Sequence, residues 1–303
     1  MINTVSEINR RLADNPETFI QECDNEYRLK IKSVAAYVCN NKKIRLVSIA
    51  GPSGAGKTTT ANLLRAMLAE SGIETYVISL DNFYFSRDIV DVGKVDPESV
   101  EALDVELLKE CLFSLLEKGT ANLPVYDFAQ GLSLKDAEKV TLSENSIIIL
   151  EGIHGINPVI TDALPSEKLL KLYISAYTPF VDETENVVIT GRKLRLMRRA
   201  LRDKRFRGSD INRTLSFWDG VIKAEDKFLY GFIKYANFHI HTMHAFEPAL
   251  YRNEFIEMTK EVSEDHPFYD YLKQICKGLE EFTTISSEFI PQNSLIREFI
   301  GQD

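Results

Sequence analysis

Apolar residues gather in five short runs along the chain, each of the length of a buried strand. These runs occupy residues 44–50, 75–80, 146–150, 171–175 and 237–242. Between the runs apolar positions recur at helical spacing, as at Leu64, Met67 and Leu68, before Gly72 ends the pattern. Strands that alternate with helices predict an α/β fold, in which a mostly parallel sheet is covered by helices on both faces. Ligands of such a sheet lie beyond the carboxyl ends of its strands.

Two regions outside this alternation have a helical, amphipathic pattern. The first is residues 1–43, where the apolar positions among the charges are Val5, Ile8, Leu12, Leu29, Ile31, Val34 and Val38. The second is residues 251–303, which are again charge-rich. We therefore expect one domain over 44–250, with a helical extension at 1–43 and a second at 251–303 that packs on the same domain.

Composition narrows the class of protein. The 303 residues carry a net charge of −9, which argues against binding nucleic acid over a broad surface. The longest clearly apolar run, residues 147–150, is far shorter than the ~18 residues that a membrane span requires. The N-terminus lacks the pattern of an export signal, and the four cysteines have no C-x-x-C spacing. We therefore expect a cytoplasmic protein that has no membrane span, no disulfide bond and no zinc site.

The stretch "GPSGAGKTTT" follows the first strand directly and opens the next helix. It matches the G-x-x-x-x-G-K-[ST] phosphate loop, whose backbone amides cradle phosphates while the lysine reaches the β and γ phosphates. The hydroxyl of Thr58 is then a ligand of Mg²⁺. The residues expected to bind ATP here are Gly51, Ser53, Gly54, Ala55, Gly56, Lys57, Thr58 and Thr59.

Two carboxylates stand at strand ends. Asp81 follows the second strand, where it either accepts the proton of an attacking hydroxyl or caps a turn. Glu151 follows the third strand, at a place where a carboxylate supports Mg²⁺. His154, three residues further on, either lines the site or forms a structural hydrogen bond.

Residues 192–207 are strongly basic in an otherwise acidic chain. Leu194, Met197 and Leu201 form an apolar stripe on the expected helix. Another face carries Arg195, Arg198, Arg199 and Arg202. We interpret this helix as a lid whose arginines neutralise the charge of a transferring phosphoryl group, with a solvated basic face or a nucleic-acid contact as the alternatives.

Taken in order, the motifs "GPSGAGKTTTA", "SLDNFY", "VYDF", "ILEGIHGINP" and "RRALRDKRFRG" resemble the uridine kinase and phosphoribulokinase family of P-loop kinases. The resemblance implies a five-stranded parallel sheet, a helical lid at about 192–225, and ATP with Mg²⁺. It also implies catalytic roles for Lys57, Asp81, Arg199 and Arg202, with Asp81 as the base for the 5′-hydroxyl of a nucleoside. The nucleoside pocket would include Asp81, Tyr84, Asp96, Tyr126 and Phe128, Arg207 would contact ATP, and Thr58 and Glu151 would hold the metal.

The chain departs from the pyrimidine-specific members at the places where those members read the base. Their histidine, second arginine and glutamine align here with Gly131, Ser209 and Phe217. Uridine or cytidine remains the expected acceptor, and a purine nucleoside or another small alcohol, such as a sugar phosphate or pantothenate, is the alternative. A nucleotide-driven switch or nucleic-acid motor is the alternative from another class, although no N-K-x-D guanine motif follows the loop. The expected partners are ATP and a small nucleoside, without nucleic acid, and a homo-oligomer stays open.

Overall fold

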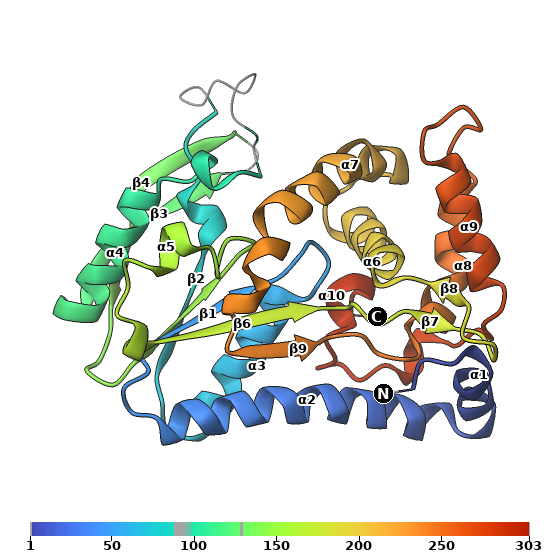
Figure 1. The fold of residues 1–303 in the computed structure, drawn as a ribbon, viewed down its shortest axis with the longest axis horizontal. Coiled ribbons are helices and arrows are strands. Elements are labelled where there is room, and N and C mark those ends of the chain that lie inside the picture. The colour runs from blue at the N-terminus through green and yellow to red at the C-terminus, as the bar shows by residue number, and fades with distance from the viewer. Residues whose placement is uncertain (1, 88–95, 97, 128–129, 303) are drawn as a thin grey trace.

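A central sheet of five parallel strands, in the order β2-β5-β1-β6-β9, organises the protein. The computed structural model describes residues 2–87, 96, 98–127 and 130–302 (Figure 1). The strands are β1 Leu46–Ala50, β2 Thr75–Ser79, β5 Ile147–Glu151, β6 Leu169–Ser175 and β9 Phe238–His241. All five coincide with apolar runs of the sequence, so the predicted parallel sheet is confirmed.

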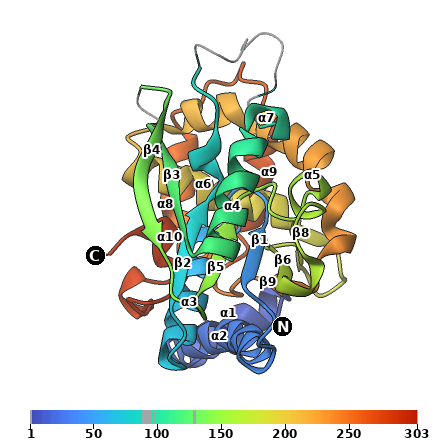
Figure 2. The same ribbon diagram turned by 90° about the vertical axis from the view of Figure 1, so that its left-hand side faces the viewer.

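Helices cover both faces of this sheet (Figures 1 and 2). On one face α2 (Pro16–Asn40) and α3 (Lys57–Glu70) lie side by side, and α4 (Val105–Lys118) lies over the other. Successive side chains of a strand point to opposite faces, so neighbouring residues of β5 enter different cores. Ile149 packs in the cluster that contains α3, whereas Ile148 packs in the cluster that contains α4.

The end of α3 shows how the sequence sets a helix boundary. Gly72 has φ +73°, the left-handed conformation that glycine adopts without strain. Its amide donates to the carbonyl of Ala69, and the amide of Ile73 donates to that of Leu68. These two bonds form a Schellman motif, so the predicted stop at Gly72 is confirmed.

The remaining helices lie mostly in the second half of the chain. They are α1 Val5–Asp14, α5 Pro158–Thr161, α6 Gly191–Phe206, α7 Ile211–Phe228, α8 Glu247–Thr259, α9 Tyr269–Leu279 and α10 Arg297–Ile300. Side chains of Thr190 and Asp210 accept hydrogen bonds from the first turns of α6 and α7, respectively. Such caps satisfy amides that have no partner within the helix.

Two antiparallel hairpins were not predicted from the sequence. One pairs β3 (Thr120–Asp127) with β4 (Leu132–Thr141), and the other pairs β7 (Phe180–Val181) with β8 (Val187–Ile189). Most residues of β4 are exposed, so this strand lacks the alternation of apolar and polar positions that marks a half-buried strand.

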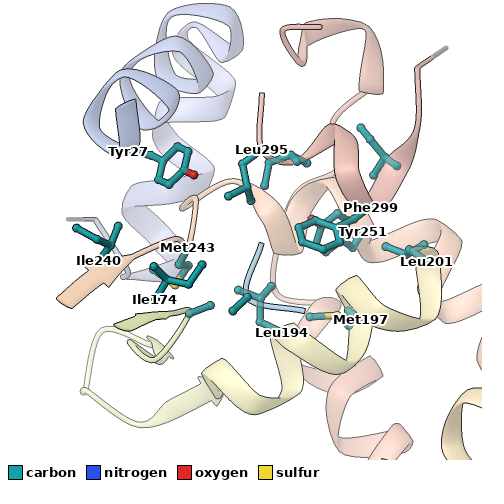
Figure 3. Close-up of a cluster of buried hydrophobic side chains, with 14 of the residues drawn as sticks. Tyr27, Ile174, Leu194, Met197, Leu201, Ile240, Met243, Tyr251, Leu295 and Phe299 are labelled. Carbon is teal, nitrogen blue, oxygen red and sulfur yellow. The ribbon is translucent and has the colours of Figure 1, made fainter. Parts of the chain in front are cut away.

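The terminal segments share one apolar core with the sheet. Ile31 of α2, Val47 of β1 and Phe299 of α10 belong to the same buried cluster. Figure 3 shows part of this cluster, in which Tyr27 of α2 and Leu295, close to the C-terminus, accompany Leu194 of α6. Segments far apart in the sequence therefore pack together in one apolar core.

Candidate active site

The loop between β1 and α3 has the backbone geometry that its glycines allow. Gly54 and Gly56 have φ +73° and +84°. A Cβ atom on Gly51 would lie 2.4 Å from the carbonyl oxygen of Ile174. Gly56 precedes α3 without a side-chain cap, so the amides of the first turn of α3 are directed at the loop. This is the geometry of an anion site at a helix N-terminus.

Lys57 and Thr58 begin α3 at this site. The Lys57 ammonium donates to the carbonyl oxygens of Gly51 at 3.0 Å and Pro52 at 3.3 Å, which places its charge over the loop. Thr58 is exposed, so its hydroxyl is accessible to a ligand. Thr59, the next residue, donates its hydroxyl to the carboxylate of Glu298.

Asp81 lies in the short 3-10 turn that follows β2. Its side chain is accessible to solvent, yet protein surrounds it closely; this desolvation raises the pKa of the carboxyl, and the charges of Lys57 and Arg207 oppose the rise. Lys57 of the phosphate loop is therefore close enough to Asp81 for the two charges to interact.

Glu151 is the last residue of β5 and pairs in register with Ser79 of β2. It is 7% exposed, and burial raises the pKa of its carboxyl. The charge of Lys57 lowers this pKa, whereas that of Asp81 raises it. The two carboxylates thus repel each other beside the loop, and a divalent cation would relieve that repulsion.

The described residues contain no group of three histidines, cysteines or carboxylates that could hold a metal on their own. Nucleotide-bound Mg²⁺ does not need one, because it takes one or two protein ligands together with phosphate oxygens and water. Thr58 and Glu151 fit that role. Bound there, Mg²⁺ would neutralise charge on the phosphates.

The residues predicted for the nucleoside pocket converge around Tyr84. Its ring meets that of Tyr126 edge to face, with the centroids 5.8 Å apart. Burial raises the pKa of Tyr84, and the nearby charges of Asp81, Glu98 and Asp96 raise it further. Four of the five predicted pocket residues therefore lie together. The fifth, at position 128, falls outside the described residues.

Glu98 is a candidate site residue that sequence reasoning missed. Burial raises the pKa of its carboxyl, while the charges of Arg199 and Lys57 lower it and that of Asp81 raises it. Asp96, the predicted ribose ligand, is exposed, and its side chain accepts a hydrogen bond from the backbone amide of Glu98 at 3.0 Å. The signal that could have found Glu98 is its place in the same "KVDPES" motif, two residues after Asp96.

His154 holds this segment through one hydrogen bond. Its Nε2 lies 2.9 Å from the backbone carbonyl oxygen of Glu98, to which it donates in its neutral form. The imidazole is 1% exposed, and burial lowers its pKa to about 4. Of the two interpretations drawn from the sequence, the geometry favours the structural hydrogen bond.

Arg199, Arg202 and Arg207 gather around one carboxylate, Asp203. Their nitrogens lie 3.4, 3.6 and 3.2 Å, respectively, from its oxygens. Arg199 also donates to the hydroxyl of Ser53 at 2.9 Å. These three predicted arginines therefore gather around Asp203, and Arg199 among them contacts the phosphate loop.

Arg195 and Arg198 require a correction, because they do not form an exposed face of α6. They are 2% and 0% exposed and pair with Glu225 of α7 and Glu247 of α8. Arg195 donates to the carbonyl of Ser53 at 2.9 Å, and Arg198 donates to that of Gly54 at 3.0 Å. These residues thus hold the backbone of the phosphate loop. Helical spacing could not reveal this, since both acidic partners lie on other helices.

Gly131, at one departure from the pyrimidine-specific pattern, has a backbone conformation that favours glycine. Gly131 has φ +71°, and a Cβ atom there would lie 2.5 Å from Cδ of Arg87. A histidine at this position would therefore require Arg87 to move.

Phe217 is 57% exposed, whereas Trp218 beside it is fully buried, so only Trp218 is a core residue.

Strand, loop, helix and carboxylates together define a P-loop α/β protein of the kinase type. The model of the phosphoribulokinase / uridine kinase family matches residues 46–247, well over half of the chain. The chain belongs to this family, as its motifs predicted.

Two relatives show how far the similarity extends. The chain is 33% identical over 187 residues to uridine kinase of Schizosaccharomyces pombe, covering 60% of this chain and 37% of that protein. It is 31% identical over 196 residues to uridine kinase of Clostridium novyi, covering 63% of this chain and 84% of that protein. The chain thus spans little more than a third of the length of the first relative.

Among solved structures, a proposed fructose transport system kinase from Silicibacter sp. TM1040 has a TM-score of 0.51 at 18% identity. The match covers 69% of this chain and 98% of that chain, and it shows a shared fold. Separately, no helix within the described ranges is long and apolar enough to cross a membrane.

Proposed function

We propose that this protein transfers the γ-phosphoryl group of ATP to the 5′-hydroxyl of a nucleoside, with uridine or cytidine as the expected acceptor. One observation carries the proposal: Asp81, in the turn after β2, is close enough to interact electrostatically both with Lys57 at the start of α3 and with Tyr84, which ends the same turn. A base placed between a phosphate loop and an aromatic pocket is suited to a hydroxyl acceptor rather than to water alone.

The chemistry follows from this arrangement. The loop amides and Lys57 hold the phosphates, and Asp81 accepts the proton as the hydroxyl oxygen attacks phosphorus. The new O–P bond forms while the bond to the β-phosphate oxygen breaks, which releases ADP. Arg199 contacts Ser53 of the loop and Arg202 lies on the next turn of α6, from where both would neutralise charge on the transferring group.

The alternatives concern the acceptor and the class of protein. A purine nucleoside or another small alcohol would use the same loop and base, and the glycine at position 131 favours no particular base. A nucleotide-driven switch would hydrolyse ATP without any acceptor. The acidic net charge gives no support to a nucleic-acid motor.

A screen of nucleosides and small alcohols with ATP and Mg²⁺, measuring ADP release, tests the proposal. We expect ADP release to depend on a pyrimidine nucleoside and to stop without Mg²⁺. Lys57→Ala is the control, because it removes the charge that stabilises the phosphates and should abolish release. ADP release that needs no acceptor would favour the nucleotide-driven switch. ADP release only with a non-nucleoside alcohol would make that alcohol, and not a nucleoside, the acceptor.

A further inference from the structure

The segment that precedes and includes α10 touches the phosphate loop. Cδ1 of Leu295 lies 2.7 Å from the place that a Cβ atom of Gly56 would occupy. Glu298 accepts a hydrogen bond from the hydroxyl of Thr59, and its Oε1 lies 3.7 Å from Nη1 of Arg202. These C-terminal residues lie beyond position 247, where the match to the family model ends.

Buried contacts hold this segment in place. The hydroxyl of Ser294 donates to Asp24 of α2 at 2.7 Å. Arg297 donates to the carbonyl oxygens of Ile290 at 2.7 Å and Gly301 at 3.0 Å. Figure 3 shows Leu295 and Phe299 within the shared apolar cluster. These contacts hold the backbone of Glu298 beside the loop.

The location of Glu298 is an anion position. Thr59 belongs to the first turn of α3, where the helix dipole and free amides favour negative charge. The phosphates of a nucleotide occupy the same end of the helix in a phosphate loop. The carboxylate of Glu298, 16% exposed, therefore shares this region with any bound polyphosphate.

We propose that Glu298 is a specificity-determining residue of the donor site, a fixed negative charge that weakens the binding of nucleotide phosphates, ADP included. The proposal rests on the proposed function in one respect, since it takes the loop as the donor site. Repulsion between like charges at this range weakens binding, and the contact with Arg202 reduces the charge that this arginine offers to the phosphates.

Calorimetric titration of the full chain with ADP and Mg²⁺ tests the proposal. Glu298→Gln keeps the shape and removes the charge, so we expect ADP to bind roughly 3- to 10-fold more tightly than to the wild type. Glu298→Ala, which also removes the bond to Thr59, should tighten ADP in the same way. Adenosine, which has no phosphate, should show no change.

Glu254→Gln is the matched control, because Glu254 forms ion pairs with Lys204 and Arg205 on the same helix α6. It should leave ADP affinity unchanged. Unchanged or weaker ADP binding in both Glu298 variants would overturn the proposal, and weaker binding would assign Glu298 to the metal or the ribose. If the wild type binds no ADP, the assignment of the phosphate loop as the donor site is wrong. If it binds ADP but phosphorylates no nucleoside, only the proposed function fails.

Discussion

Three carboxylates of this site are closely surrounded by protein and lie near the charge of Lys57. Asp81, Glu98 and Glu151 all have raised carboxyl pKa values because protein displaces water around them. Lys57 opposes the rise at each of the three. The lysine of the phosphate loop therefore favours the ionised form of these carboxylates as well as facing the phosphates.

Asp81→Asn separates a base from a structural residue. We expect kcat to fall by roughly 10² to 10⁴, the usual contribution of a positioned proton acceptor, while ATP still binds the loop. Shape changes little, and basicity is lost. ATP affinity and nucleoside-dependent ADP release should be measured on one preparation; full turnover would contradict the role as base, and loss of both would make Asp81 structural.

The pH dependence of kcat provides a second test of Asp81. The base must be ionised, and its pKa is raised above the ordinary value for aspartate, about 3.9. We therefore expect kcat to fall as the pH drops through a pKa that lies above that value, and to level off at higher pH. Glu98→Gln serves as the control and should retain this acidic limb, whereas a pH-independent kcat would argue against a carboxylate base.

At the scale of elements, α6 joins the phosphate loop to two other helices. Arg195 connects Ser53 to Glu225 of α7, and Arg198 connects Gly54 to Glu247 of α8. The start of α6 is therefore fixed to the loop. Arg199 and Glu225 contact Ser53 of the loop as well, so we propose that any lid motion within 192–225 is confined to the part between these two residues.

Arg198→Met measures the strength of this attachment. The variant leaves Glu247 buried without its cation, and breaking such a pair costs about 3–5 kcal/mol. We expect the free energy of unfolding to fall by about that amount in urea titrations. Arg192→Met is the control, because its pair with Asp226 is partly exposed and is worth about 0–1 kcal/mol. Similar losses in both variants would show that burial of the Arg198 pair has no special effect.

At the scale of the whole molecule, buried polar contacts connect the two ends of the chain. Asp24 of α2 accepts from Ser294 at 2.7 Å and lies 3.0 Å from Nε2 of His244, which follows β9. Asp24 is 4% exposed, so these contacts are shielded from water. The N-terminal and C-terminal segments thus meet directly beside the kinase core.

Asp24→Ala tests whether the ends of the chain stabilise the fold as one unit. The change leaves the buried hydroxyl of Ser294 without its acceptor, which costs about 1–3 kcal/mol, and removes the carboxylate that lies 3.0 Å from Nε2 of His244. We expect a lower free energy of unfolding with a single transition in urea. Asp14→Ala is the control, since Asp14 is largely exposed beside Arg10 and its loss should change little. Two separate transitions in the wild type would show that the ends unfold independently.

The sequence by itself determined the sheet and the centre of the site. The five apolar runs became the five parallel strands, and the phosphate loop stands between strand and helix, because both signals lie within short stretches of chain. Asp81 and Glu151 were predicted for the same reason, since Asp81 follows β2 and Glu151 ends β5, and their roles in the site stay predictions. The exposed strand β4 escaped prediction because it has almost no buried face.

Only the tertiary structure decided which groups face one another. Glu225, Glu247 and Glu298 had no motif or periodicity to mark them, yet each contacts the loop or an arginine that holds it. The Thr59 and Glu298 side chains are 239 positions apart in the chain. An ion pair depends on distance in space, whereas periodicity reports only neighbours along a helix or strand. The acidic partners of the α6 arginines could therefore be identified only in the folded structure. The same holds for the distinction between arginines that support the loop and those proposed to act in catalysis.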